Sequence, residues 1–382
     1  MWQIFSRFLA LGLVSFGGPA AHIGYFRKTF VDELAWLPAD KYASLVALSQ
    51  FLPGPGSSQV GFAIGYHRGG LFGGMAAFLG FTLPSFVLLL LLALTSSQFM
   101  QYPITQGIIH GLKLMAVVIV ADAVLTMFKQ FCRCKVTQAF MAIMAAIALV
   151  LPNQWLQIGA LLIFALLGSQ LLVKADTGQS ETREPLALGW GYLLLFSLLL
   201  LTSFIGLGGE LGKMAADFYQ VGCLVFGGGH VVLPLLQASV GQAVTPDEFL
   251  TGYALAQAVP GPMFTLATFL GAEMLPEQAF IGAVIATLAI FLPGFLLMLA
   301  ALKSWHSISA RPRIAAGLAG INAAVVGLLL AALYQPVFSS AVLTSLDMVW
   351  VILGFALLKI IKPNILLLVF GFAGLGAGLA FI

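Results

Sequence analysis

A three-part pattern occurs twice along this chain, and each copy places helix-breaking Pro and Gly inside strongly apolar sequence. The first copy consists of Phe16-Gly17-Gly18, Gln50-Phe51-Leu52-Pro53-Gly54-Pro55 and Leu83-Pro84-Ser85-Phe86. The second copy, at offsets of 210, 207 and 209 residues, consists of Phe226-Gly227-Gly228, Gln257-Ala258-Val259-Pro260-Gly261-Pro262 and Leu292-Pro293-Gly294-Phe295. The nearly constant offset predicts two homologous halves. Broken elements at paired positions are typical of the substrate site of a transporter.

Composition indicates that the chain folds in a membrane. Hydrophobic residues make up 60% of it, charged residues make up 8%, and the mean hydropathy is +1.04, whereas a soluble domain carries about 25% charged residues. Apolar runs of helical length recur along the chain. Because about 20 helical residues cross a hydrocarbon core of about 30 Å, we predict spanning helices and not barrel strands. The expected fold is an all-α polytopic membrane protein.

The duplication also predicts the domain organisation. We expect an N-terminal transporter repeat over residues 1–173, a polar linker over 174–185, and a C-terminal repeat over 186–382 that begins with an extra span. The apolar segments 42–52 and 56–66 flank the first Pro-Gly-Pro, and a helix of that length reaches only about 16 Å, roughly half of a bilayer. Each Pro-Gly-Pro therefore predicts a re-entrant hairpin or a broken span. The total number of membrane segments stays open between about 10 and 13.

Loop charge differs between the two copies. The loops around the first Pro-Gly-Pro carry four basic residues, Arg27, Lys28, Lys41 and Arg68. The matching loops of the second copy carry acidic residues and no Lys or Arg. Since Lys and Arg concentrate in cytoplasmic loops, we predict that the two repeats have inverted orientations. This count holds only if the short apolar run 137–150 does not cross the membrane separately from 154–173.

With its duplicated Phe-Gly-Gly and Gln-x-x-Pro-Gly-Pro elements, the chain resembles the chromate ion transporter family over essentially its whole length. The resemblance implies a secondary transporter that exports chromate from the bacterial cytoplasm across the inner membrane, with sulfate as a related oxyanion. One position departs from the family pattern. Pro19 follows the first Phe-Gly-Gly, whereas Gly229-His230 follows the second. The two copies therefore need not contribute equally to the site.

A tetrahedral oxyanion offers only hydrogen-bond acceptors, so its site must supply N–H and O–H donors. The N-terminus of a half-helix supplies unpaired amides and a positive dipole end. After the first Pro-Gly-Pro the chain reads Gly56-Ser57-Ser58, and after the second Thr265 matches Ser58 at an offset of 207. We predict that Ser58 and Thr265 form a symmetry-related donor pair. The alternative is that these hydroxyls only satisfy helix backbone at the breaks.

Several other residues of the repeated elements are candidates for substrate binding. The glycines Gly17, Gly18, Gly227 and Gly228 either let backbone approach a ligand or let helices pack closely, and packing is favoured for any single one. Gln50 and Gln257 either donate to the anion or hold loose carbonyls of the broken segment. The glycines expected to shape the breaks themselves are Gly54, Gly56 and Gly261.

Placing an ionisable side chain inside an apolar membrane stretch costs free energy, so such residues are functional candidates. Lys113 and its counterpart Asn322, at an offset of 209, could face the anion, although snorkelling of the Lys to the interface is the competing reading. Asp122 has no acidic counterpart and either carries a coupling proton or pairs with a lysine such as Lys113 or Lys129, and pairing is favoured. His22 and His230 follow the glycine-rich turns and are proton-coupling candidates, with a purely polar anchor as the alternative.

Other classes of function are less well supported. Net charge is +3 and dispersed, so no nucleic-acid partner is expected. No catalytic spacing of Cys, His, Asp or Glu is visible, so we expect neither an enzyme nor a cofactor or metal site. An anion channel remains the alternative to a carrier. The expected partners are a small inorganic anion and the lipid bilayer, and a homodimer stays open. Sequence alone leaves the physiological anion, the direction and the energy source undecided.

Overall fold

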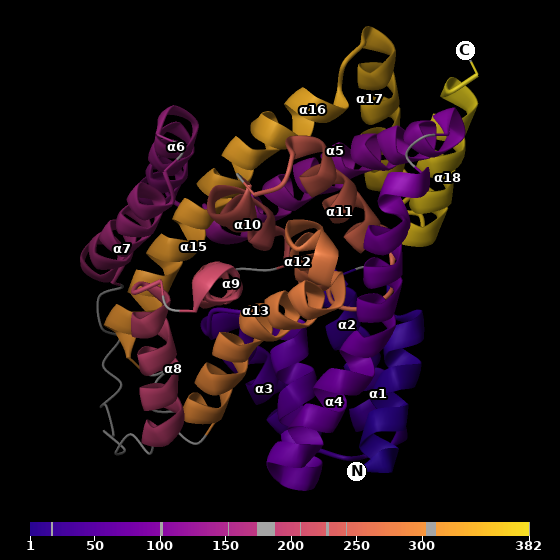
Figure 1. The fold of residues 1–382 in the computed structure, drawn as a ribbon. Coiled ribbons are helices and arrows are strands. Elements are labelled where there is room, and N and C mark those ends of the chain that lie inside the picture. The colour runs from indigo at the N-terminus through magenta and orange to yellow at the C-terminus, as the bar shows by residue number, and fades with distance from the viewer. Residues whose placement is uncertain are drawn as a thin grey trace.

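The computed structural model describes residues 1–16, 18–99, 102–151, 153–173, 188–206, 208–226, 229–241, 243–302 and 311–381. Within these ranges the chain is built from helices and contains no strand (Figure 1). This confirms the all-α fold. The polar linker predicted at 174–185 lies outside the described residues, as do Gly17, Gly227 and Gly228.

The first repeat begins with short helices and continues with long ones. Its elements are α1 (Trp2–Val14), α2 (Gly18–Phe26), a π-helical turn (Arg27–Glu33), α3 (Ala39–Phe51), α4 (Gly56–Phe99), α5 (Pro103–Phe131), α6 (Lys135–Val150) and α7 (Gln154–Leu171). The run 137–150 therefore lies in a helix of its own, α6, distinct from α7. The sequence count required that this run not cross the membrane separately, and its being a separate helix makes α6 a candidate crossing.

The second repeat follows an additional helix, α8 (Trp190–Ser203). Its elements are α9 (Gly209–Leu224), α10 (Val232–Val240), α11 (Pro246–Ala258), a 3-10 turn (Met263–Thr265), α12 (Leu266–Met274), α13 (Ala279–Ala301), α15 (Pro312–Ala332), a π-helical turn (Leu333–Phe338), α16 (Ser339–Ala341), α17 (Ser345–Ile360) and α18 (Ile365–Leu379). The order of elements matches that of the first repeat, with α9 in the place of α1 and α11 in the place of α3.

Helix α4 is two helices joined at a sharp turn. Gly69 and Gly70 leave helical geometry, and Gly70 has a φ of +60°, which favours glycine. The two halves fold back on each other with Gly65 against Gly73, where a Cβ on either residue would collide with backbone of the other. In the second repeat α12 and α13 form the equivalent hairpin, with Gly271 against Gly282. Small residues thus let antiparallel helices approach closely.

The first two helices of the chain, α1 and α2, also form an antiparallel pair. Met1 lies against Gly69, Ile4 against Gly73 and Gly12 against Phe81, so α1 runs parallel to the second half of α4. Phe8 in α1 contacts Phe26, at the end of α2, with ring centroids 5.5 Å apart. Helix α2 therefore returns alongside α1 toward the end from which α1 started.

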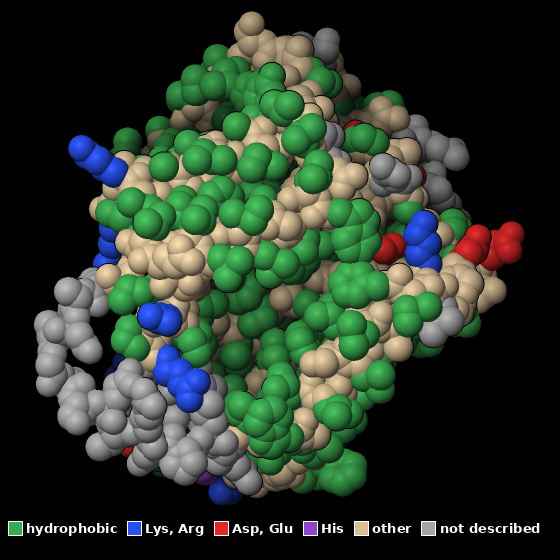
Figure 2. Space-filling view, turned by 90° about the vertical axis from the view of Figure 1, so that its left-hand side faces the viewer, with side chains coloured by type: hydrophobic (Ala, Val, Ile, Leu, Met, Phe, Trp, Pro, Cys, Tyr) green, Lys and Arg blue, Asp and Glu red, His purple; other side chains and the backbone are tan. Residues whose placement is uncertain are grey.

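Four stretches are long and apolar enough to cross a membrane, namely Gly56–Thr95, Pro103–Phe131, Pro276–Ala301 and Pro312–Ala341. They form two matched pairs, because the first and third are equivalent in the repeats and so are the second and fourth. Figure 2 shows one face of the molecule largely covered by hydrophobic side chains, with few charged ones. The protein is a multi-pass membrane protein with two homologous repeats.

The repeats exchange their last two helices. Helices α6 and α7 pack along α15 of the second repeat, and α18 and α17 pack along α5 of the first. In Figure 1, α6 and α7 accordingly lie beside α15 on the left. Helices α17 and α18 lie beside α5 on the right. The glycine contacts are matched: Gly168 meets Gly320, and Gly107 meets Gly376. Each repeat is thus completed by the C-terminal hairpin of the other.

Candidate functional site

The two Pro-Gly-Pro breaks meet at the centre of the molecule through reciprocal hydrogen bonds. The amide of Gly54 donates to the carbonyl of Val225, 2.7 Å away, and the amide of Gly261 donates to the carbonyl of Ser15, 2.9 Å away. Ser15 and Val225 occupy matching positions, immediately before each Phe-Gly-Gly. Such a reciprocal contact is the mark of a two-fold relation between the repeats.

The third repeated element also packs across the two-fold relation. Gly54 and Gly261 have φ values of +118° and +113°, a region that favours glycine. A Cβ on Gly54 would lie 2.9 Å from the Cα of Gly294, and a Cβ on Gly261 would lie 2.7 Å from the Oγ of Ser85. Gly294 and Ser85 belong to the Leu-Pro elements of the opposite repeats. All three repeated elements therefore converge on one place.

The helix starts after the two breaks differ in their side-chain donors. The Oγ of Ser58 is buried and has no hydrogen-bond partner among the described residues. The hydroxyl of Thr265 instead donates to the carbonyl of Pro262, 2.6 Å away. In this conformation Thr265 follows the alternative, a hydroxyl that satisfies backbone at the break, whereas the hydroxyl of Ser58 is free to donate. The reason is local, because Thr265 ends a 3-10 turn whereas Ser58 lies inside the first turn of an α-helix.

Unpaired backbone donors are present at both breaks. No backbone carbonyl in the described part of the chain accepts a hydrogen bond from the amides of Gly56, Ser57 or Ser58, nor from those of Met263 or Phe264. Unpaired amides at a helix start attract anions, and the helix dipole adds positive potential. The geometry at the breaks is suited to an anion with several acceptor oxygens.

A buried polar cluster surrounds the first break. The ring of His22 contacts the Oγ of Ser57 and the carbonyl of Ser15, each at 3.3 Å. The Nε2 of Gln59 donates to the carbonyls of Pro53, at 2.9 Å, and Gly294, at 3.0 Å. Within the described part of residues 1–99 four buried side-chain atoms lack a partner, namely Ser15 Oγ, Ser58 Oγ, Gln59 Oε1 and Thr82 Oγ1. Unpaired buried polar atoms are rare and point to a missing ligand or water.

The predicted glutamine pair is not equivalent in the structure. Gln50, at the end of α3, is exposed, whereas Gln257, at the end of α11, is buried with its Nε2 3.8 Å from the Sδ of Met263. Gly18 has a φ of +75° and faces the same Met263, although at a distance that leaves room. Among these candidates the structure brings Gly18, Gln257 and Met263 together and leaves Gln50 apart.

The predicted charges in the apolar helices are paired across the repeats. Lys113 in α5 forms an ion pair with Asp247 at the start of α11, and Asp122 in α5 forms one with Lys359 in α17. Pairing of Asp122 with a lysine was expected, but with Lys113 or Lys129 as the partner. Asn322, the counterpart of Lys113, is half-buried, and its Oδ1 has no partner among the described residues.

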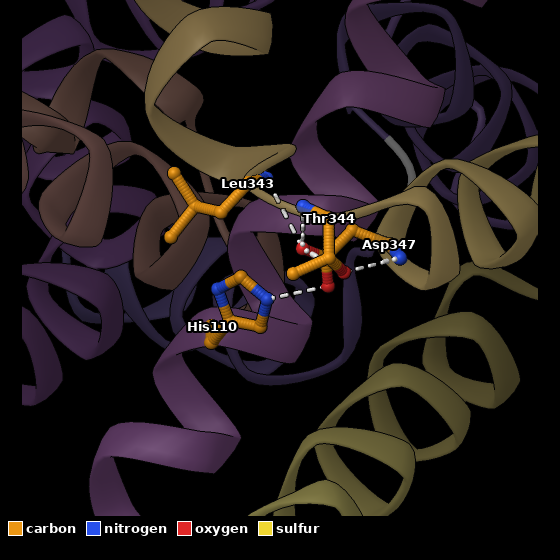
Figure 3. Close-up of polar contacts among 4 residues, drawn as sticks. All are labelled: His110, Leu343, Thr344 and Asp347. Carbon is orange, nitrogen blue, oxygen red and sulfur yellow. Dashed lines mark hydrogen bonds and ion pairs between the residues drawn. The ribbon is translucent and has the colours of Figure 1, made fainter.

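Sequence reasoning missed a second contact between α5 and α17, in addition to the pair of Asp122 and Lys359. The Nε2 of His110 lies 2.8 Å from the Oδ1 of Asp347, whose Oδ2 accepts hydrogen bonds from the amides of Leu343 and Thr344 (Figure 3). The signal available in the sequence was the capping pattern Thr344-x-x-Asp347. Its long-range partner His110 carries no local signal.

His230, the remaining proton-coupling candidate, contacts a tyrosine. Its Nδ1 lies 3.2 Å from the hydroxyl of Tyr253 in α11. No group of three or more His, Cys, Asp or Glu side chains in the described part of the chain is arranged to hold a metal ion.

Helices α3 and α11 occupy equivalent places but very different surroundings. Helix α11 packs along α5, whereas α3 makes no extended contact with α15 in the described residues. One face of α3 is exposed and consists of Asp40, Ala43, Ala47 and Gln50. The matching face of α11 consists of Asp247, Leu250, Ala254 and Gln257, of which the last three are buried. Small and polar residues do not suit a lipid-facing helix surface, so the α3 face fits the wall of a water-filled space.

The sequence profile of the chromate transporter family matches residues 2–169 and 212–377. The chain belongs to the chromate transporter family. The matched ranges contain both Pro-Gly-Pro breaks, both Leu-Pro elements and the exchanged helix pairs. The additional helix α8 lies between the two matched ranges.

Three curated transport proteins align with most of the chain. An uncharacterised transporter of Methanocaldococcus jannaschii is 29% identical over 314 residues, which cover 80% of this chain and 77% of that protein. A chromate transport protein of Pseudomonas aeruginosa is 29% identical over 333 residues, covering 86% and 79%. A chromate transport protein of Cupriavidus metallidurans is 25% identical over 334 residues, covering 85% and 80%. No solved structure matches the chain.

Proposed function

We propose that this chromate transporter family member is a secondary transporter that exports chromate, or a similar tetrahedral oxyanion such as sulfate, from the bacterial cytoplasm across the inner membrane. Relatives named as chromate transport proteins support the substrate class. The observation that carries the proposal is the meeting of two broken helices whose opening amides are unpaired. An anion with acceptor oxygens on all sides can accept hydrogen bonds from the unpaired amides of both helix starts.

In this proposal the anion lies between the breaks, closer to the first. The amides that open α4 and the free hydroxyl of Ser58 supply donors from the first repeat, and the amides at Met263 and Phe264 supply donors from the second. The remaining unpaired hydroxyls, of Ser15 and Thr82, are further candidates for the same anion or for its bound water. Gln257 and Gly18 line the second break, and the glycines Gly54, Gly56 and Gly261 shape the turns.

Alternating access is supported by the unequal surroundings of α3 and α11. Inverted repeats that exchange conformations produce a carrier with two states, each open on one side. Here α11 is packed on α5, and α3 presents an exposed polar face. The described conformation corresponds to a state open on the α3 side. In this proposal that side faces the cytoplasm, an orientation that the basic loops around α3 support.

An odd number of crossings supports the inverted orientation. The pairs α1–α2 and α3 with the first half of α4 return to the side from which they start. In this proposal the second half of α4 and then α5, α6, α7 and α8 each cross the membrane, so α9 starts on the side opposite to α1. The separate helix α6 is therefore compatible with inversion, because α8 restores the odd count. The domain boundaries 1–173 and 186–382 follow from the same arrangement.

Uptake of labelled chromate into inside-out membrane vesicles tests the proposal. Export from the cytoplasm predicts uptake that saturates and that excess unlabelled sulfate reduces if sulfate shares the site. Saturation also separates a carrier from a channel. Equal chromate entry into vesicles with and without the protein, at verified membrane expression, would reject chromate as the substrate.

A further inference from the structure

The ion pair between Lys113 and Asp247 joins the two repeats at one end of the site. Lys113 lies on α5 with only 7% of its side chain exposed, and Asp247 lies in the first turn of α11 with 59% exposed. A lysine this deeply buried needs a compensating charge, because removing its partner leaves an unpaired ion in a low-dielectric place. The pair therefore favours the conformation in which α11 stays packed on α5.

The equivalent pair in the other half lacks its cation. Asp247 corresponds to Asp40 at an offset of 207, and Lys113 corresponds to Asn322 at an offset of 209. In the structure Asp40 is exposed, and the Oδ1 of Asn322 is buried with no partner among the described residues. If α3 packed on α15 as α11 packs on α5, Asp40 would meet an amide and not an ammonium group.

The hydrophobic cores follow the same asymmetry. The core residues of α1, α2 and α3, among them Phe8, Phe26, Tyr42 and Leu48, join residues of α4 and the end of α13 in a cluster separate from the large core. The matching residues of α9, α10 and α11 belong to the large core that also contains α5 and α15. The α3 side is thus the separable part of this conformation, and the α11 side is the closed part.

We propose that Lys113 and Asp247 form a charged latch that sets which side of the carrier is closed at rest. The latch closes the α11 side, and Asn322 leaves the α3 side without an equivalent, so a single lysine biases the two otherwise matched states. This inference rests on the alternating access of the proposed function, but not on the identity of the anion.

Exchanging Lys113 and Asn322 tests the latch, and the readout is the water accessibility of the α3 and α11 faces. In a protein whose three cysteines are replaced by serine, one cysteine is placed at Ala47 on the α3 face or at the matching Ala254 on the α11 face. A hydrophilic maleimide then reports the water accessibility of each face in purified protein reconstituted in liposomes permeable to the reagent. We expect the cysteine at 47 to react faster than the cysteine at 254, because Ala47 is exposed and Ala254 is 1% exposed.

The variants should shift this ratio in a defined order. Lys113→Asn should lower the ratio of the two rates by roughly tenfold or more, the change that about 1.4 kcal/mol produces in an equilibrium. The double variant Lys113→Asn, Asn322→Lys should reverse the order of the two rates. Adding Asp40→Asn to that double variant should remove the reversal, because the new lysine then has no partner.

The controls keep the test decisive. Lys129→Asn removes an exposed lysine from the last turn of the same helix and should leave the ratio unchanged. Thermal unfolding identifies variants that fail to fold, and Asp247→Asn offers a second way to open the latch if Lys113→Asn is unstable. A folded double variant with the wild-type order of rates would overturn the latch. Reversal without chromate transport would sustain the latch and reject only the substrate.

Discussion

Ser58 and Thr265 show how two equivalent residues acquire different roles. The hydroxyl of Thr265 donates to the carbonyl of Pro262, whereas the hydroxyl of Ser58 is buried without a partner in the described part of the chain. Ser58→Ala should therefore weaken anion binding more than Thr265→Ala. A hydrogen bond to a charged group contributes about 1.5–3 kcal/mol, which is roughly a ten- to hundredfold loss of affinity for Ser58→Ala. Concentration dependence of chromate uptake measures it, and a larger effect of Thr265→Ala would contradict the assignment.

Cys134 offers a prediction that depends on pH. It is the exposed member of the three cysteines, and hydrogen bonding from Thr137 lowers the pKa of its thiol, whereas burial raises the pKa of Cys132 to about 11. A lowered pKa keeps the thiolate populated to lower pH, so alkylation of Cys134 should persist below the range of an ordinary thiol. In Thr137→Val the pH profile of the alkylation rate should move upward. An unchanged profile would rule out the hydrogen bond as the cause.

The helix breaks depend on backbone shape as much as on side chains. Gly54 and Gly261 hold positive φ values and pack against Gly294 and Ser85 of the opposite repeats. A β-branched residue in such a conformation costs about 1–3 kcal/mol before any collision is counted. Gly54→Val and Gly261→Val should both lower uptake more strongly than Ser58→Ala, since each tilts the amides that face the anion.

Steric and conformational costs can be separated at the second break. A Cβ on Gly261 collides with the side chain of Ser85, whereas a Cβ on Gly54 approaches the Cα of Gly294. Ser85→Gly should therefore partly restore uptake to Gly261→Ala, whereas the nearest atom to a Cβ on Gly54 is the backbone Cα of Gly294, with the Nε2 of Gln59 next at 3.2 Å, so no single truncation relieves Gly54→Ala. Failure of Ser85→Gly to improve Gly261→Ala would show that the backbone conformation, and not the collision, dominates.

Features set by local sequence could be predicted, whereas contacts between the two repeats could not. Local signals sufficed for the helices, the two repeats and the glycines of the breaks, because a Pro-Gly-Pro acts on its own backbone. Partners such as Lys113 and Asp247, 134 residues apart, or His110 and Asp347, 237 residues apart, depend on which repeat supplies the neighbouring helix. Equivalent sequence positions likewise did not reveal that α3 is exposed while α11 is buried.

The most direct test of the whole account is the response of both faces to the anion. Cysteines at Ala47 and Ala254, one at a time, are labelled with a hydrophilic maleimide in the reconstituted protein before and after addition of chromate. Alternating access around the two breaks predicts opposite changes, with labelling at position 47 falling and labelling at position 254 rising. Changes in the same direction at both positions would contradict two states that exchange their open sides.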